Sequence, residues 1–286
     1  MWRSILFIPV LQDRFIDKAA RRGADAIVLD LEASIASNRK LEARAALPKA
    51  VDKLAAQGMD VLVRINMLWR PAMNDLEQAI RLGVKAILLP DCKSAGEIQA
   101  VDSVMAEIER ERGLERIALV PAIESAKGIM NASEIASAAQ RIVALTFGIE
   151  DYLADMETAP DRETLSAAAL TIAHAARSAG VDPLLVPESL ANLSDHARFE
   201  SAAKRGKSMG STGGFAIHPS QVEILNRTFT PSQNEYEWCE KVISAAKKAE
   251  ESGLGAVTLE GRMIDLPIIK RAKKLRERHM RFGLAQ

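Results

Sequence analysis

The chain has 286 residues, a formal net charge of zero at pH 7 and a hydrophobic content of 48%, which suits one large α/β domain or two ordinary ones. The balanced charge argues against general nucleic-acid binding, which normally needs a basic excess, and no apolar run approaches the roughly 20 residues that cross a bilayer. The two cysteines, Cys92 and Cys239, lack metal-ligand spacing. We therefore expect a cytoplasmic protein with neither nucleic acid nor membrane as a partner.

Short apolar runs alternate with amphipathic stretches along most of the chain. Such alternation is typical of a parallel sheet covered by helices. The predicted strands are 4–9, 25–32, 60–66, 85–90, 117–124, 142–148, 184–189 and 214–219, and the predicted helices include 40–57, 94–112, 126–140, 162–179 and 195–208. Eight such units predict a (β/α)8 barrel. A doubly wound open sheet is the main alternative, although no GxGxxG follows the first strand.

The last part of the sequence has a different pattern. Residues 233–252 predict a long helix, which could be the eighth of the barrel, and the glycines after it mark turns around a short strand-like piece. A basic helix is expected to begin near Pro267. We therefore predict a barrel domain over 1–252 and a C-terminal segment over 253–286 that covers the barrel or reaches a neighbouring subunit.

Polar residues stand where the predicted strands end, which is the active-site face of such barrels. They are Asp30, Glu32, Arg64, Asn66, Glu124, Glu150, Asp151, Glu188 and His218. Carboxylates without several His or Cys ligands favour Mg²⁺ over Zn²⁺, so Glu124 and Asp151 are the candidate metal ligands. Arg64 offers a planar fork for a substrate carboxylate or an enolate oxygen. A metal and an arginine together suit making or breaking a C–C bond through an enolate.

Structural roles are the alternative for each of these residues. Asp151 could cap a helix, and Ser125, directly after Glu124, is itself a good cap. Arg64 could be an ion-pair partner of Asp30 or Glu32. His218 would more often be a hydrogen-bonded core or loop histidine than a catalyst.

An ordered set of motifs adds a resemblance that covers nearly the whole chain. The motifs include RSILFIP, KAARRGADAIVLDLEASI, VRIN, IESAKGI, FGIEDYLADM, AIHPSQV and GRMIDLP. Together they resemble the citrate lyase beta-subunit-like group of the HpcH/HpaI aldolase superfamily.

The resemblance implies a (β/α)8 barrel that assembles as trimers or dimers of trimers and cleaves or forms malyl-, citramalyl- or citryl-thioesters, giving an acyl-thioester and an α-oxo acid. It places the Mg²⁺ ligands on Glu124 and Asp151 and the substrate arginine on Arg64. It also places on Asp265 an acid/base that relatives receive from the next subunit.

The departures from the family pattern concern the thioester end. Val10 stands where a glycine is usual, which makes close backbone approach to a phosphate harder, and Arg14 and Lys18 remain as candidate partners for the phosphates of coenzyme A. Ala33 and Asp91 also replace an acid and a lysine. Two alternatives follow: an aldolase that acts on a free hydroxy-oxo acid without coenzyme A, or a non-catalytic beta-like subunit.

Overall fold

A computed structural model describes residues 2–253 and 255–283 of the chain, so Leu254 and 284–286 of the predicted C-terminal segment lie outside the described residues. The chain divides into two compact units, Met1–Asn226 and Arg227–Gln286. Among the described residues, no helix is both long and apolar enough to cross a membrane.

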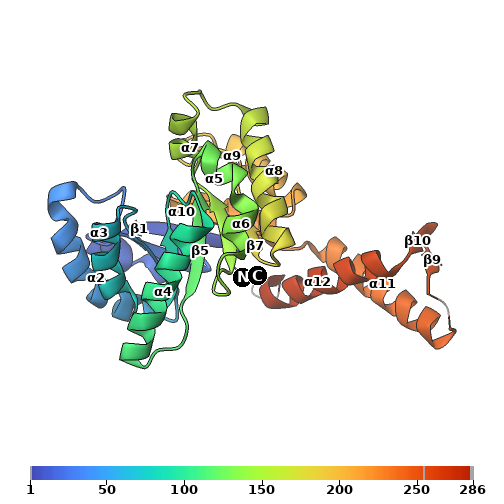
Figure 1. The fold of residues 1–286 in the computed structure, drawn as a ribbon. Coiled ribbons are helices and arrows are strands. Elements are labelled where there is room, and N and C mark those ends of the chain that lie inside the picture. The colour runs from blue at the N-terminus through green and yellow to red at the C-terminus, as the bar shows by residue number, and fades with distance from the viewer. Residues whose placement is uncertain (1, 254, 284–286) are drawn as a thin grey trace. The chain divides into compact units, whose positions relative to one another are not determined.

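The first unit is a barrel of eight parallel strands with helices around the outside (Figure 1). The sheet order is β7-β6-β5-β4-β3-β2-β1-β8, and a parallel bridge between Leu184 and Gly213 joins its two ends. The strands are β1 Ser4–Pro9, β2 Ala26–Asp30, β3 Asp60–Arg64, β4 Val84–Leu89, β5 Ala118–Ile123, β6 Ala144–Phe147, β7 Asp182–Leu184 and β8 Gly214–Ala216. This order confirms the predicted (β/α)8 barrel and rules out the open sheet.

Helices follow the strands in chain order. They are α1 Asp13–Ile16, α2 Lys40–Ala55, α3 Trp69–Ala79, α4 Ala95–Arg112, α5 Ala126–Met130, α6 Ala132–Ser137, α7 Ile149–Asp155, α8 Arg162–Ser178, α9 His196–Ser208 and α10 Pro219–Phe229. Single 3-10 turns lie at Ala19–Arg22 and Ser37–Arg39. The predicted helix over 126–140 is two helices, because Asn131 leaves the helical region (φ −99°, ψ 6°) and its side chain donates to the Lys93 carbonyl.

Several predicted strands extend beyond the observed ones, and the seventh and eighth have the clearest causes. The seventh strand is Asp182–Leu184 rather than 184–189, because the amide of Leu185 donates to the hydroxyl of Ser211 instead of continuing the ladder. The eighth strand stops at Ala216, because the next two amides bind the side chain of Gln221. Both changes turn strand residues into loop residues at the carboxyl end of the barrel.

The second unit holds α11 Gln233–Glu251, the hairpin of β9 Val257–Leu259 and β10 Arg262–Ile264, and α12 Leu266–Phe282. Helices α11 and α12 pack side by side (Figure 1). Cys239, Val242, Ile264 and Ala272 form the core of this unit. Helix α11, which the sequence analysis counted with the barrel, therefore packs with the C-terminal segment, and the predicted covering role of that segment stays a prediction.

Candidate active site

The alternation of side chains along each strand directs some polar residues toward the interior of the barrel. Successive side chains of a strand point to opposite faces, and the apolar residues of the barrel interior include Val28, Leu62 and Ala122. Two positions further along the same strand faces stand Asp30, Arg64 and Glu124. The inward row of each strand thus changes from apolar to charged at its carboxyl end, as the sequence analysis predicted.

A cavity of about 800 Å³ lies at this end of the barrel. Its lining brings together most of the predicted strand-end residues: Asp30, Arg64, Glu124, Glu150, Asp151, Glu188 and His218. Phe7, Phe147, Phe215 and Ile217 supply apolar wall. The arrangement therefore offers charged groups and apolar surface to the same ligand.

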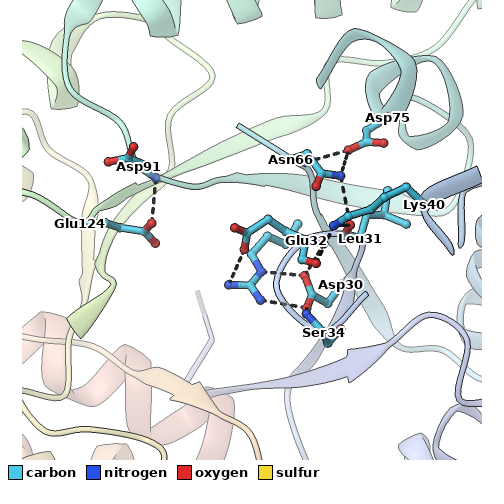
Figure 2. Close-up of polar contacts among 10 residues, drawn as sticks. Asp30, Leu31, Glu32, Ser34, Lys40, Asn66, Asp75, Asp91 and Glu124 are labelled. Atoms are coloured by element: carbon cyan, nitrogen blue, oxygen red, sulfur yellow. Dashed lines mark hydrogen bonds and ion pairs between the residues drawn. The ribbon is translucent and has the colours of Figure 1, made fainter. Parts of the chain in front are cut away.

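Glu124 is one of the buried acids of the cavity. It is 8% exposed, and its Oε2 accepts a hydrogen bond from the amide of Asp91 at 3.0 Å (Figure 2). Asp91 can aim that amide because its backbone is left-handed, with φ of 46°. Burial, together with the charges of Asp151 and Glu32, raises the pKa of Glu124 to about 8.

Gly148 lets the backbone of the next strand approach this carboxylate. A Cβ atom at position 148 would lie 2.3 Å from Oε1 of Glu124, far inside van der Waals contact. Gly148 is also the N-cap residue of α7, whereas Ser125 caps α5 with its side chain. The alternative that Asp151 serves as a helix cap is therefore wrong.

Asp151 lies in the first turn of α7 and is exposed in the cavity. Its carboxylate accepts no hydrogen bond from residues 2–253 or 255–283. Asp151 and Glu124 also both line a second, smaller cavity of about 330 Å³. Two like charges raise each other's energy when both are ionised, so this pair suits a bound cation.

The described part of the chain contains no group of three or more His, Cys, Asp or Glu residues arranged to hold a metal. A site of two carboxylates agrees with the preference of Mg²⁺ for one or two protein carboxylates plus waters and substrate oxygens. It does not fit a structural Zn²⁺ site, which needs four protein ligands. The donor set of Glu124 and Asp151 therefore fits Mg²⁺.

Two acids and one aromatic ring fix the position of the Arg64 guanidinium. Its Nε and Nη2 donate to Asp30 at 2.7 and 2.8 Å, and its Nη1 lies 3.1 Å from Oε2 of Glu32. The guanidinium carbon stands 4.7 Å above the ring centroid of Phe7. Burial opposes the charged form, but the Asp30 hydrogen bonds and charge outweigh it and raise the pKa of Arg64.

The ion-pair interpretation of Arg64 is confirmed, and its role in binding a substrate carboxylate stays a prediction. It is the ion-pair partner of Asp30 and Glu32, and it lines the cavity. A guanidinium has five N–H groups, and the contacts to these two acids engage three. Two N–H groups remain for a carboxylate in the cavity.

A buried network fixes the end of β3. Asp75 of α3 is fully buried and accepts from the backbone amide of Asn66 at 2.8 Å and from its side-chain nitrogen at 2.6 Å (Figure 2). Arg44 of α2 donates to the other oxygen of Asp75 at 2.6 Å. Two helices thereby hold the residue that follows the strand of Arg64.

The same network holds the segment that carries Glu32. Lys40 donates to the carbonyl oxygens of Leu31 and Glu32 at 2.8 and 2.7 Å, and Asn66 donates to the Leu31 carbonyl at 3.0 Å (Figure 2). Asp30 accepts from the amides of Glu32 and Ser34. The sequence analysis did not assign positioning roles to Lys40 or Asp75, because only the folded contacts show which carbonyls and amides they bind.

The candidate phosphate partners, unlike the acids, lie outside both cavities. Arg14 and Lys18 are exposed residues that do not line either cavity, and the guanidinium of Arg14 lies over the ring of Phe15, 4.6 Å from its centroid. Phe15 itself and Arg22 line the large cavity. The sequence analysis did not single out Arg22, although the pair of arginines at positions 21 and 22 could have drawn attention to it.

Asp265 belongs to the second compact unit. Its side chain accepts a hydrogen bond from the amide of Ile268 at 3.4 Å and caps the N-terminus of α12. Its acid/base role stays a prediction.

The model of the HpcH/HpaI aldolase/citrate lyase family matches residues 3–219. The chain belongs to this family. Its relatives include the citrate lyase subunit beta of Escherichia coli K12, 33% identical over 99% of this chain and 95% of that protein. The L-malyl-CoA/beta-methylmalyl-CoA lyase of Rhodobacter capsulatus is 32% identical over 95% of this chain and 92% of that protein. The resemblance inferred from the motifs is thereby confirmed.

Solved structures agree with this membership. A crystal structure of CitE from Mycobacterium tuberculosis in complex with magnesium, acetoacetate and coenzyme A has a TM-score of 0.75 and 26% identity, covering 96% of this chain and 97% of that one. RipC from Yersinia pestis has a TM-score of 0.67 and 28% identity, covering 82% of this chain and 97% of that one.

Proposed function

We propose that the protein is a Mg²⁺-dependent carbon–carbon lyase that cleaves or forms a malyl-, citramalyl- or citryl-type thioester, with an acyl-thioester and an α-oxo acid as the two halves. The observation that carries the proposal is the meeting of Glu124, Asp151 and Arg64 in one cavity at the carboxyl ends of the barrel strands. The lyase relatives, and the magnesium and coenzyme A in the CitE complex, support it.

Glu124 and Asp151 would hold the cation, which supplies Lewis-acid polarisation of the oxo-acid oxygens when it is bound. Arg64 would bind the carboxylate of the oxo acid with its two remaining N–H groups. Asp30, Glu32 and Phe7 keep the guanidinium in place before the substrate arrives, so little reorganisation is needed on binding.

Asp265 is proposed as the acid/base that exchanges a proton at the acyl carbon next to the thioester. It would come from a neighbouring copy in a homotrimer or a dimer of trimers. Mixing Asp265→Ala chains with Glu124→Ala chains tests this arrangement, because subunit exchange would create some sites with both residues intact. No recovery of activity after demonstrated exchange would contradict the shared site.

The lyase proposal is tested by incubating the purified protein with Mg²⁺ and malyl-, citramalyl- and citryl-CoA, with and without EDTA, and measuring oxo-acid release. Cleavage of one member that EDTA abolishes is expected. Silence across the panel, with oxo acid and Mg²⁺ still bound, would show that coenzyme A is not the acyl carrier.

One observation favours a second candidate, an aldolase acting on a free hydroxy-oxo acid. Val10 is buried where the family has glycine, and neither Arg14 nor Lys18 lines the cavity. Calorimetry separates the two, since tight binding of a coenzyme A thioester would contradict the aldolase. Turnover by the purified chain alone would also exclude a non-catalytic beta-like subunit. The cytoplasmic location belongs to the same proposal and is supported by the unpaired Cys92 and Cys239.

A further inference from the structure

The turn between β8 and α10 is held tightly against the loop after β7. Gln221 is 1% exposed, and its Oε1 accepts hydrogen bonds from the amides of Ile217 and His218 at 2.9 and 3.2 Å. Its Nε2 donates to the carbonyl of Leu190 at 3.0 Å. His218, which lines the large cavity, is therefore carried by a fixed backbone.

The ring of His218 is fixed as well. The backbone amide of Ser220 lies 3.2 Å from Nδ1, and the Ser220 hydroxyl lies 2.9 Å from the same atom. A backbone amide only donates, so Nδ1 is an acceptor and the hydrogen of the neutral ring is on Nε2.

Helix capping accounts for only one of the two ring nitrogens of His218. At the start of α10, Nδ1 of His218 accepts from the amide of Ser220, and Oε1 of Gln221 accepts from the amide of His218; this capping uses Nδ1 alone. No residue in 2–253 or 255–283 hydrogen-bonds to Nε2 of His218, and the side chain is exposed where it lines the cavity. The Nε2–H group of His218 is therefore an oriented donor that is available to a ligand in the cavity.

The barrel topology separates this donor from Glu124. In the closed strand order, β8 lies between β1 and β7 and is three strands away from β5, so Glu124 and His218 stand on separate parts of the rim. Phe15 and Ile217, which are 40% and 43% exposed, line the cavity together with His218. The cavity surface around His218 thus combines exposed apolar side chains with this N–H donor, and Glu188 lines the cavity from the loop after the neighbouring strand β7.

We propose that His218 is a catalytic residue that donates an Nε2–H hydrogen bond to the carbonyl oxygen of the acyl-thioester half. The inference rests on the proposed lyase function. When the C–C bond breaks, its electron pair moves through the acyl carbon onto the thioester oxygen and forms an enolate. The hydroxyl of the other half gives its proton to water and becomes the oxo-acid carbonyl, and the enolate carbon takes up a proton from Asp265, the acid of the proposed lyase, so that no proton is gained or lost overall.

His218 keeps its own proton throughout this sequence. Its hydrogen bond strengthens as charge develops on the thioester oxygen, which is the behaviour of an oxyanion donor. Removing one such donor lowers kcat by about 10²–10³-fold in well-studied hydrolases.

Two variants separate this role from helix capping. His218→Asn keeps an acceptor for the Ser220 amide, and asparagine is a strong N-cap residue, but it has no donor at the Nε2 position. His218→Gln places an amide N–H near that position. We expect His218→Asn to lower kcat by about 100-fold or more with the melting temperature and the Mg²⁺-dependent binding of pyruvate unchanged, and His218→Gln to restore part of kcat.

A wild-type kcat in His218→Asn, or a change in KM alone, would overturn the proposal. A second readout does not need turnover, because the chain has only four histidines and ring ¹⁵N signals can be assigned. Adding acetyl-CoA with Mg²⁺ should shift the Nε2 signal of His218. An unmoved signal contradicts the role of His218, whereas a moved signal in a protein that cleaves no thioester contradicts the lyase proposal alone.

Discussion

The raised pKa of Glu124 predicts that the metal-free protein loses stability as the pH rises. The folded protein keeps the Glu124 proton up to about pH 8, whereas the ordinary value of a glutamate is 4.5. Between these pH values the folded state binds more protons than the unfolded state, so the free energy of unfolding falls with rising pH. One such group contributes a fall of about 1.4 kcal/mol per pH unit, or about 5 kcal/mol at most.

Urea unfolding in EDTA at several pH values between 5 and 8 measures this effect. We expect Glu124→Gln to become more stable than the wild type as the pH rises, because the amide stays neutral. Glu150→Gln, which changes an exposed acid on the same cavity, should keep the wild-type slope. Excess Mg²⁺ should restore stability to the wild type and not to Glu124→Gln. Parallel pH profiles of wild type and Glu124→Gln would refute the argument.

Three further substitutions test the geometry. Arg64→Lys keeps the charge but loses the fork, so the dissociation constant of pyruvate with Mg²⁺ should rise by roughly 10- to 100-fold in calorimetry; an unchanged constant would contradict its role. Gly148→Ala should displace Glu124 and weaken Mg²⁺ binding by about tenfold or more, whereas Gly96→Ala, whose Cβ meets no atom nearer than 4.0 Å, should not. Asp75→Ala should lower the free energy of unfolding by about 3–5 kcal/mol, because it leaves an arginine without its buried partner; a change within about 0.5 kcal/mol, as at an ordinary surface site, would contradict this account of the network.

The strand-end acids could be predicted because two simple rules act together. The strand period of two decides which residues point inward, and barrel topology gathers the carboxyl ends of strands that are distant in the chain. Glu124 and Asp151 are 27 positions apart and still line the same two cavities. Arg64 followed from the same rules, and its pairing with Asp30 or Glu32 was one of the alternatives for it; that it pairs with both acids required the structure.

The supporting contacts could not be predicted from local sequence. Asp75 sits within an ordinary amphipathic helix, and only the packing of α2 and α3 brings it to Asn66 and Arg44. The early ends of β7 and β8 have the same cause, because side chains from elsewhere take the amides that a longer strand would have used. Side chains that compete for backbone groups act only in the folded chain, so the pattern of apolar residues in the sequence cannot predict them.

The Mg²⁺ dependence of oxo-acid release in Asp151→Asn, compared with its neighbour variant Glu150→Gln, tests the central claim most directly. Both acids lie in the first turn of α7 and line the cavity, but only Asp151 is proposed to hold the cation. The account predicts that Asp151→Asn loses turnover by about 100-fold or more at any Mg²⁺ concentration reached, while Glu150→Gln keeps the wild-type Mg²⁺ requirement. Wild-type turnover in Asp151→Asn would contradict it.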